Sequence, residues 1–84
     1  MKGIVFTELI EFVEEALGFE IADQMIGNAG LANEGAFTQA GNYPFEDLQK
    51  LVVRLSAATG KPAGDLLYLF GQYLFGRLIK LYPV

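Results

Sequence analysis

The sequence contains no cysteine, no histidine and no tryptophan. Without cysteine the chain can form no disulfide bond and offers no thiolate nucleophile. Without cysteine and histidine it lacks the usual ligands of zinc and iron–sulfur clusters, and the commonest axial ligand of haem. These absences exclude most metal centres that residues of this chain could build alone.

Basic residues are also few. Six Lys and Arg residues stand against ten Asp and Glu residues, which gives a formal net charge of −4. The six basic residues form no cluster along the sequence. Because nucleic-acid affinity depends largely on neutralising phosphates, this balance argues against a nucleic-acid partner.

Long uninterrupted hydrophobic runs are missing as well. Four early glutamates break what would be the apolar core of a secretory signal, so no such signal is predicted: Glu8, Glu11, Glu14 and Glu15. The most apolar stretch, Leu66 to Leu81, contains Gln72, Arg77 and Lys80 and is too short and interrupted for a membrane span. We therefore expect a cytoplasmic chain without a membrane span.

The residues that are present are mostly apolar, with 52% of the 84 residues hydrophobic. A chain of this length forms one domain at most. A domain this small buries only a modest share of its surface. The composition therefore indicates that part of the apolar surface is normally covered by something else.

Apolar residues recur at helical spacing in four segments, namely Lys2–Leu17, Glu20–Ala29, Pro44–Thr59 and Pro62–Leu81. Glycine follows each of the first three helices, and proline at position 83 is expected to stop the fourth. The stretch from Leu31 to Tyr43 has no sustained period, so we expect a loop anchored by Leu31 and Phe37. The sequence predicts a small all-α fold of four helices with one long loop.

The fourth helix is apolar around more than half of its circumference, which is typical of a helix buried on several sides. Three short neighbours can hardly supply that cover. Gly71 and Gly76 also lower its helix propensity, by roughly 1 kcal/mol each relative to alanine. Aromatic residues such as Phe70 and Tyr73 are by default core residues. The alternative, equally favoured for this helix, is a pocket wall for a flat apolar ligand.

No catalytic site can be assembled from these residue types. The acidic residues of the first helix are interpreted as a solvated helix face, since no base or metal ligand accompanies them. No nucleophile–base pair can be built without histidine, and the glycines follow no phosphate-loop spacing. We therefore expect no enzyme activity and no metal site.

Several short motifs occur in order along the whole chain. They are Met1-Lys-Gly-Ile-Val-Phe, Gly18, Ala29-Gly-Leu, Tyr43-Pro, Thr59-Gly-Lys-Pro, Leu69-Phe-Gly-Gln-Tyr-Leu-Phe and Leu81-Tyr-Pro. Each motif alone is weak, but the set in this order is specific. The chain resembles the N-terminal part of a bacterial haem–nitric oxide/oxygen binding domain (H-NOX or HNOB), whose relatives include the haem sensor of soluble guanylate cyclase.

The resemblance implies a haem held between a helical N-terminal subdomain and an α/β C-terminal subdomain. The C-terminal subdomain of the family supplies the proximal histidine and a Tyr-x-Ser-x-Arg motif for the haem propionates. Neither occurs in this sequence before Val84. The resemblance thus implies that residues 1–84 form the distal-wall subdomain alone, with haem in the complete domain and none expected in this chain by itself.

The resemblance also implies the cofactor-binding residues. Val5, Leu9, Leu74 and Leu78 fall where the family lines its distal haem pocket. Oxygen-binding members carry tryptophan and asparagine at the positions of Leu9 and Leu74, and these residues support a tyrosine that hydrogen-bonds oxygen. Since leucine donates no hydrogen bond, the implied ligand is nitric oxide. A structural alternative is that these leucines simply fill the core.

The family implies that a histidine kinase, a diguanylate cyclase or a chemotaxis receptor is the signalling partner. An alternative of a different class is a helical protein-interaction module that never binds haem. Haem ligation by a tyrosine of this chain is a further, less favoured possibility. If the chain lacks its C-terminal partner, five apolar side chains should become exposed, and we expect the chain to self-associate through them. They are Val5, Leu9, Phe70, Leu74 and Leu78.

Overall fold

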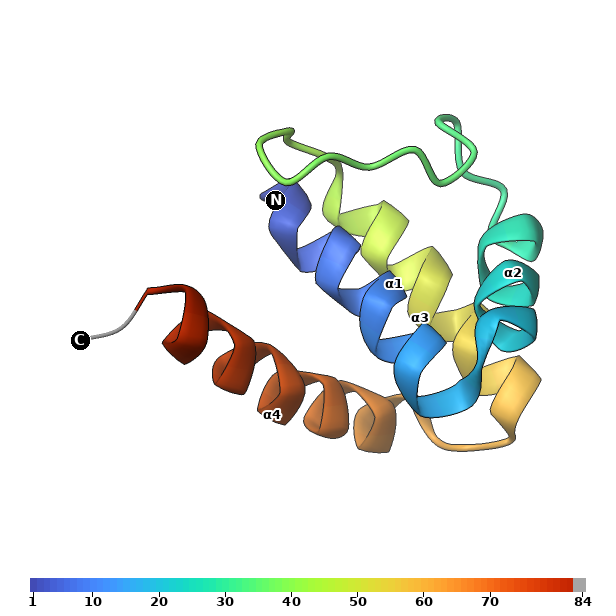
Figure 1. Ribbon diagram of the computed structural model, residues 1–84. Coiled ribbons are helices and arrows are strands. Elements are labelled where there is room, and N and C mark those ends of the chain that lie inside the picture. The colour runs from blue at the N-terminus through green and yellow to red at the C-terminus, as the bar shows by residue number, and fades with distance from the viewer. Residues whose placement is uncertain (83–84) are drawn as a thin grey trace.

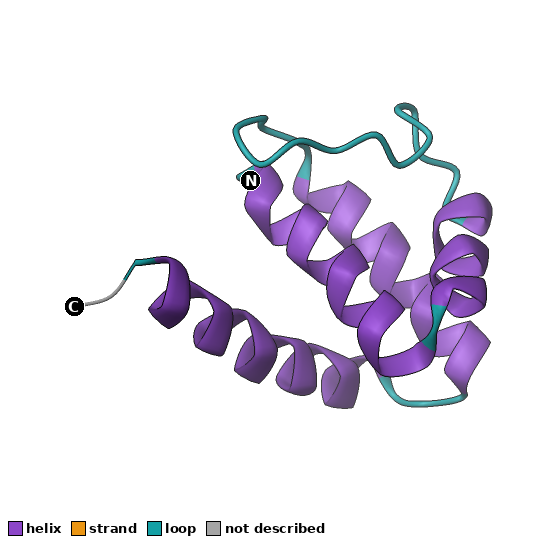
Figure 2. Cartoon of the chain, viewed as in Figure 1, coloured by secondary structure: helices purple, strands orange, loops and turns teal. Residues whose placement is uncertain are grey.

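The computed structural model describes residues 1–82, so the predicted helix stop at Pro83 and the end of the chain at Val84 lie outside the described residues. Four helices follow one another: α1 (Gly3–Leu17), α2 (Phe19–Asn28), α3 (Phe45–Thr59) and α4 (Ala63–Leu81). Within residues 1–82 the only β-type pairing is one isolated bridge between Lys2 and Asn42. The predicted all-α fold with one long loop is confirmed (Figures 1 and 2).

The helix boundaries follow from local sequence. Each helix begins and ends within one residue of its predicted position, and Pro44 and Pro62 lie just before the first helical residue rather than in it. Gly18 ends α1 and precedes α2 with a φ of 96°, and Gly60 ends α3 in the left-handed conformation with a φ of 73°. Glycine adopts these positive φ values without the steric cost of a Cβ atom.

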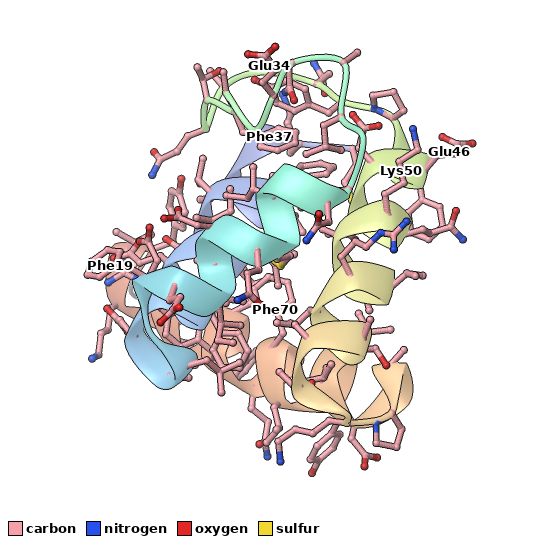
Figure 3. All side chains as sticks on the ribbon, turned by 90° about the vertical axis from the view of Figure 1, so that its right-hand side faces the viewer. Phe19, Glu34, Phe37, Glu46, Lys50 and Phe70 are labelled. Atoms are coloured by element: carbon pink, nitrogen blue, oxygen red, sulfur yellow. The ribbon has the colours of Figure 1, made fainter. Side chains whose placement is uncertain are left out.

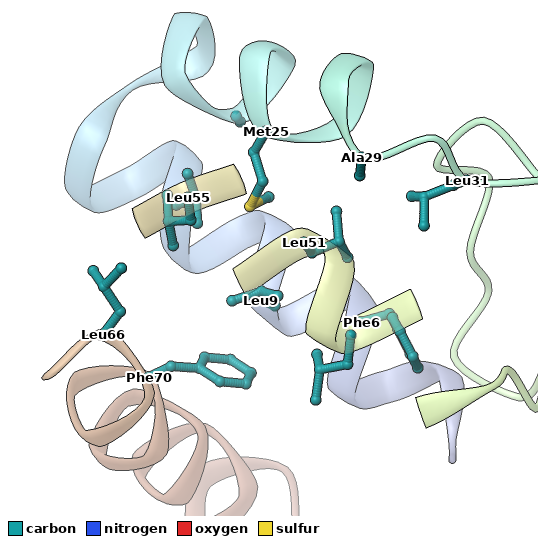
Figure 4. Packing of buried hydrophobic residues seen from close by; sticks show 12 residues of the cluster. Phe6, Leu9, Met25, Ala29, Leu31, Leu51, Leu55, Leu66 and Phe70 are labelled. Carbon is teal, nitrogen blue, oxygen red and sulfur yellow. The ribbon is translucent and has the colours of Figure 1, made fainter. Parts of the chain in front are cut away.

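The four helices enclose a single hydrophobic core (Figure 4). α2 and α4 each pack against both α1 and α3. All four helices contribute side chains, and Phe6, Met25 and Leu51 are completely buried among them. Burying a side chain of this size stabilises the fold by about 2–3 kcal/mol. The first half of α4 joins this core through Leu66 and Phe70, and no residue of α4 beyond Phe70 is fully buried.

The long loop is tied to the start of α1. Main-chain hydrogen bonds run from the amide of Gly3 to the carbonyl of Gly41 (2.8 Å) and from the amide of Tyr43 to the carbonyl of Met1 (2.9 Å). The ring of Phe37 stacks on Phe6 of α1 with centroids 4.5 Å apart. Figure 3 shows Phe37 between the loop and the helices. Leu31 is buried in the core. The predicted anchors of the loop, Leu31 and Phe37, are both confirmed.

None of the helices in the described part of the chain has the length and apolar continuity needed to span a lipid bilayer.

Candidate functional site

Two helices carry the four residues that the family resemblance assigns to a pocket. Val5 and Leu9 lie one turn apart on α1, and Leu74 and Leu78 lie one turn apart on α4. Leu9 is fully buried in the core, and Val5 and Leu74 are half-buried against that core. Leu78 is half-buried in the second half of α4. We call these four residues the candidate wall.

The expectation that all the wall residues and Phe70 lose their cover is wrong for two of them. Leu9 is 1% exposed and Phe70 is 5% exposed. The reason is that α4 packs against both α1 and α3, so that its Phe70 side chain points into the core formed with Leu9 (Figure 4). Val5, Leu74 and Leu78 remain partly accessible.

A polar bridge joins α1 to α4 next to the candidate wall. The guanidinium of Arg77 donates from Nε to Oε2 of Glu8 (3.1 Å) and from Nη2 to Oε1 of Glu8 (3.3 Å). The side chain of Glu8 is 1% exposed, and that of Arg77 is 34% exposed. The hydrogen bond to Glu8 and its negative charge raise the pKa of Arg77 above the ordinary value. The interpretation of the acidic residues as a solvated face is therefore wrong for Glu8.

The phenol of Tyr73 lies on the same side of α4 as Arg77. Its ring packs on Phe12 of α1 with centroids 5.2 Å apart. Its hydroxyl is buried and makes no hydrogen bond of good geometry, although Glu15 lies near it. Burial, reinforced by the negative charge of Glu15 and then Glu11, raises the pKa of Tyr73 to about 12. The neutral phenol is thus strongly favoured at this position.

The other side of α4 is apolar and open. Phe75 and Tyr68 are each 67% exposed, and Leu67, Leu69 and Ile79 are also exposed. A Cβ atom added to Gly71 or Gly76 would meet nothing within 4 Å. The default interpretation of the aromatic residues as core residues is wrong for the five that the structure exposes: Phe19, Phe45, Tyr68, Phe75 and Tyr82.

A shallow apolar groove of about 270 Å³ continues this open surface onto α3. It lies between the exposed side of α3 and the start of α4, and Phe45, Val53 and Leu67 line it together with neighbouring residues. The prediction that the fourth helix carries more apolar surface than its neighbours can cover is confirmed for the described residues.

The polar chemistry of these surfaces is limited. Within residues 1–82, no three His, Cys, Asp or Glu side chains come together as a possible metal site. The candidate wall offers apolar side chains only, which can shape a cavity and exclude water but can neither donate a proton nor ligate a metal. These side chains can therefore contribute apolar contact and no acid–base chemistry.

Sequence reasoning missed the bridge between Glu8 and Arg77. One signal was available, since Arg77 is the only charged residue between Asp65 and Lys80 in an otherwise apolar helix. Buried or half-buried charges are rarely left unpaired, so such a residue calls for a carboxylate partner. The sequence alone could not choose among the four glutamates of α1.

Comparisons with known proteins identify the type of domain. The family model described as Haem-NO-binding matches residues 2–84. The H-NOX protein from K. algicida, solved in its Fe(II) unliganded state, is 37% identical with a TM-score of 0.94, over 99% of this chain and 45% of that one. A point mutant of the same protein is 38% identical with the same TM-score and the same coverage.

The H-NOX protein from Shewanella woodyi, solved in solution in its Fe(II)CO ligation state, is 40% identical with a TM-score of 0.85. The match covers 99% of this chain and 44% of that one. The present chain therefore spans less than half the length of these solved relatives. No curated protein matches the chain.

Proposed function

Because this chain belongs to the haem-NO-binding (H-NOX) family, we propose that it forms the distal wall of the haem pocket in a nitric oxide sensor. The observation that carries the proposal is the candidate wall on α1 and α4, whose four side chains are all aliphatic and include three that are still partly accessible. Residues 1–84 are proposed to be the helical subdomain, and an α/β C-terminal subdomain is proposed to complete the domain.

The residues of this chain fit one face of a haem. Val5, Leu74 and Leu78 present accessible aliphatic surface, as a flat apolar macrocycle requires. Haem, when bound, supplies the iron at which the gas is taken up. The chain contains no histidine or cysteine to ligate that iron, so we propose that the ligand comes from the C-terminal subdomain.

The tyrosines of the chain are poor candidates for that ligand. Tyrosine ligates haem iron as the phenolate, and burial next to Glu15 raises the pKa of Tyr73 to about 12. The hydroxyl of Tyr43 already accepts a hydrogen bond from the amide of Thr38 (2.8 Å). Tyr68 and Tyr82 are exposed and lie off the candidate wall.

The chemistry of the wall favours nitric oxide over oxygen. Hydrogen-bond donors and polarity in the distal pocket decide whether a haem protein takes up oxygen. None of the four wall side chains is a donor. Leu9 in particular is enclosed by other apolar side chains. The wall therefore gives no polar stabilisation to oxygen, on which oxygen depends more than nitric oxide does.

The open side of α4 suits the contact that completes the domain. We propose that the C-terminal subdomain covers part of the surface that includes Leu67, Phe75 and Ile79. In its absence the same surface would support self-association of the chain. In the full system, the proposed signalling partner is a histidine kinase, a diguanylate cyclase or a chemotaxis receptor, and the sensor itself is proposed to act without enzymatic activity.

The test is haem binding by this chain alone and by a chimera. In the chimera, this chain replaces the matching first part of the K. algicida H-NOX protein. We expect the chimera to bind one equivalent of haem, with a Soret band that shifts with nitric oxide and carbon monoxide but not with oxygen. The chain alone should show no stoichiometric, gas-responsive band.

A wall substitution makes the test specific. Leu74→Trp, which places a large ring on the half-buried wall, should reduce haem binding or block the gas response of the chimera. Gln24→Trp, on the exposed surface of α2, is the control and should leave both unchanged. A folded chimera that binds no haem would support the alternative of a helical interaction module. A Soret band that shifts when oxygen is added would contradict the proposed gas preference.

A further inference from the structure

The buried bridge between Glu8 and Arg77 lies at the same level as the candidate wall. Glu8 follows Val5 by three residues and directly precedes Leu9 on α1. Arg77 follows Leu74 by three residues and directly precedes Leu78 on α4. The bridge therefore joins the two helices at the point where both carry their wall residues.

Among the described side chains, the bridge supplies the only hydrogen bonds of good geometry between α1 and α4. It consists of two hydrogen bonds to Glu8, and Glu11 lies 3.9 Å from Nη2 of the same guanidinium. The aromatic contacts of α1 with α4 lie in the first half and the middle of α4, where Phe12 packs on Phe70 and on Tyr73. The ring centroids are 5.8 Å apart for the first pair and 5.2 Å apart for the second pair.

Apolar contact and a two-point ion pair constrain a helix differently. Apolar burial is non-directional, so it opposes separation of the helices more than it opposes sliding or rotation. A guanidinium that donates two hydrogen bonds to one carboxylate fixes both distance and orientation. Because Glu8 is 1% exposed, water cannot replace Arg77 as its partner without opening the helix pair.

The second half of α4 depends most on this tie. Beyond Phe70 no residue of α4 is fully buried, and the ribbon leads away from the other three helices (Figure 1). Leu74 and Leu78 lie in this part of the helix. We propose that the Glu8–Arg77 ion pair is a positioning device that fixes α4 on α1 and so sets the spacing of the wall formed by Val5, Leu9, Leu74 and Leu78.

The positioning of α4 stands on the structure of this chain, whereas its consequence for a haem wall rests on the proposed function. Glu8 and Arg77 are not proposed to contact a ligand. They are proposed to act by positioning the four aliphatic residues of the candidate wall. Their effect should therefore appear in the placement of α4 even where no haem is present.

The chain is well suited to a direct distance measurement because it contains no cysteine. Spin labels on Asp23→Cys in α2 and Lys80→Cys in α4, both at exposed positions, report the placement of the end of α4 by double electron–electron resonance. Dilution of labelled chain with unlabelled chain removes distances between copies. The parent chain should give one narrow distance distribution.

The decisive variant is the double substitution Glu8→Met with Arg77→Met. It replaces the ion pair by apolar side chains, which buried sites often tolerate without loss of stability. We expect this variant to keep its helical circular dichroism while its distance distribution broadens at least about twofold or shifts, since the directional contact is gone. Arg77→Lys keeps the positive charge but loses the two-point hydrogen bonding of the guanidinium, so it should broaden the distance distribution less than the double substitution does.

The control is Arg54→Met, which removes an exposed arginine of α3 and should leave the distribution unchanged. A narrow, unshifted distribution in the folded double-methionine variant would overturn the proposal, because packing alone would then position α4. The measurement needs no haem. A chimera that fails to bind haem would therefore refute the proposed function while the distance result still decides the role of the ion pair.

Discussion

Replacing the two exposed glycines of α4 by alanine should stabilise this chain. Gly71 and Gly76 lie in the middle of a 19-residue helix, and an added Cβ at either position would meet nothing within 4 Å. The change therefore introduces no clash and removes the entropic cost of glycine in a helix. Alanine is favoured over glycine in a helix interior by about 1 kcal/mol per position.

The two gains should add, because the methyl groups touch neither each other nor any shared neighbour. We therefore expect Gly71→Ala with Gly76→Ala to raise the free energy of unfolding by about 2 kcal/mol. For a chain of this size, that corresponds to a rise in Tm of roughly 10 °C. Urea unfolding followed by far-ultraviolet circular dichroism measures the gain, and the m-value should stay constant.

Gly18→Ala and Gly60→Ala are the matched controls. An added Cβ at either site also meets nothing within 4 Å, but the backbone has φ values of 96° and 73°. A side chain is strained in that conformation, so these variants should be destabilised. The pair of experiments separates the effect of free space from the effect of backbone conformation.

A loss of stability in the α4 variants would refute the reasoning, because it would mean that another surface packs against these glycines in solution. Dependence of that loss on protein concentration would identify a second copy as the covering surface. In the haem-binding chimera, by contrast, we expect the gain to shrink wherever the added subdomain lies close to either glycine.

Two further predictions concern α1 and its contact with α4. Gly3→Ala should destabilise the fold by more than about 2 kcal/mol in the same urea assay. The reason is that the new Cβ atom would overlap the carbonyl oxygen of Thr38 in the loop that is tied to α1. A variant as stable as the parent would contradict the described packing of the loop. Tyr73→Phe should be at least as stable as the parent at neutral pH, because it removes a buried hydroxyl without a hydrogen-bond partner. The pKa of Tyr73 is raised to about 12 in the folded chain, chiefly by burial, so the free energy of unfolding of the parent should fall relative to that of Tyr73→Phe as the pH rises from about 10 to 12. Over this range the parent should therefore lose more stability than Tyr73→Phe, and parallel pH profiles of the two proteins would refute this.

The sequence was sufficient to predict the helices because the signals for them are local. Glycine at positions 18 and 60 and proline at positions 44 and 62 mark helix ends through their own backbone preferences. Each predicted boundary is within one residue of the structure, which is the usual uncertainty of a helix end. The anchors of the loop were predictable for a similar reason, since isolated large apolar residues in a polar stretch require a core.

The packing of the helices could not be predicted in the same way. The helical period places Glu8 on one face with Glu11 and Glu15, and nothing local indicates that α4 crosses that face at Glu8. Whether a carboxylate is solvated or buried depends on which helices meet, and that is a property of the whole fold. The same limit applies to Phe75, which the composition assigned to the core and the structure exposes.

The two sides of α4 together explain its composition. One side is tied to α1 by Phe70 and Arg77, and it needs only a few residues to do so. The other side leaves Tyr68, Phe75 and Ile79 exposed. A small monomeric protein rarely exposes a continuous apolar surface unless that surface binds something. Gly71 and Gly76 lower the helix propensity of α4, and a Cβ atom at either position would meet nothing within 4 Å. This cost in stability is consistent with the proposal that another surface approaches α4 closely at these glycines.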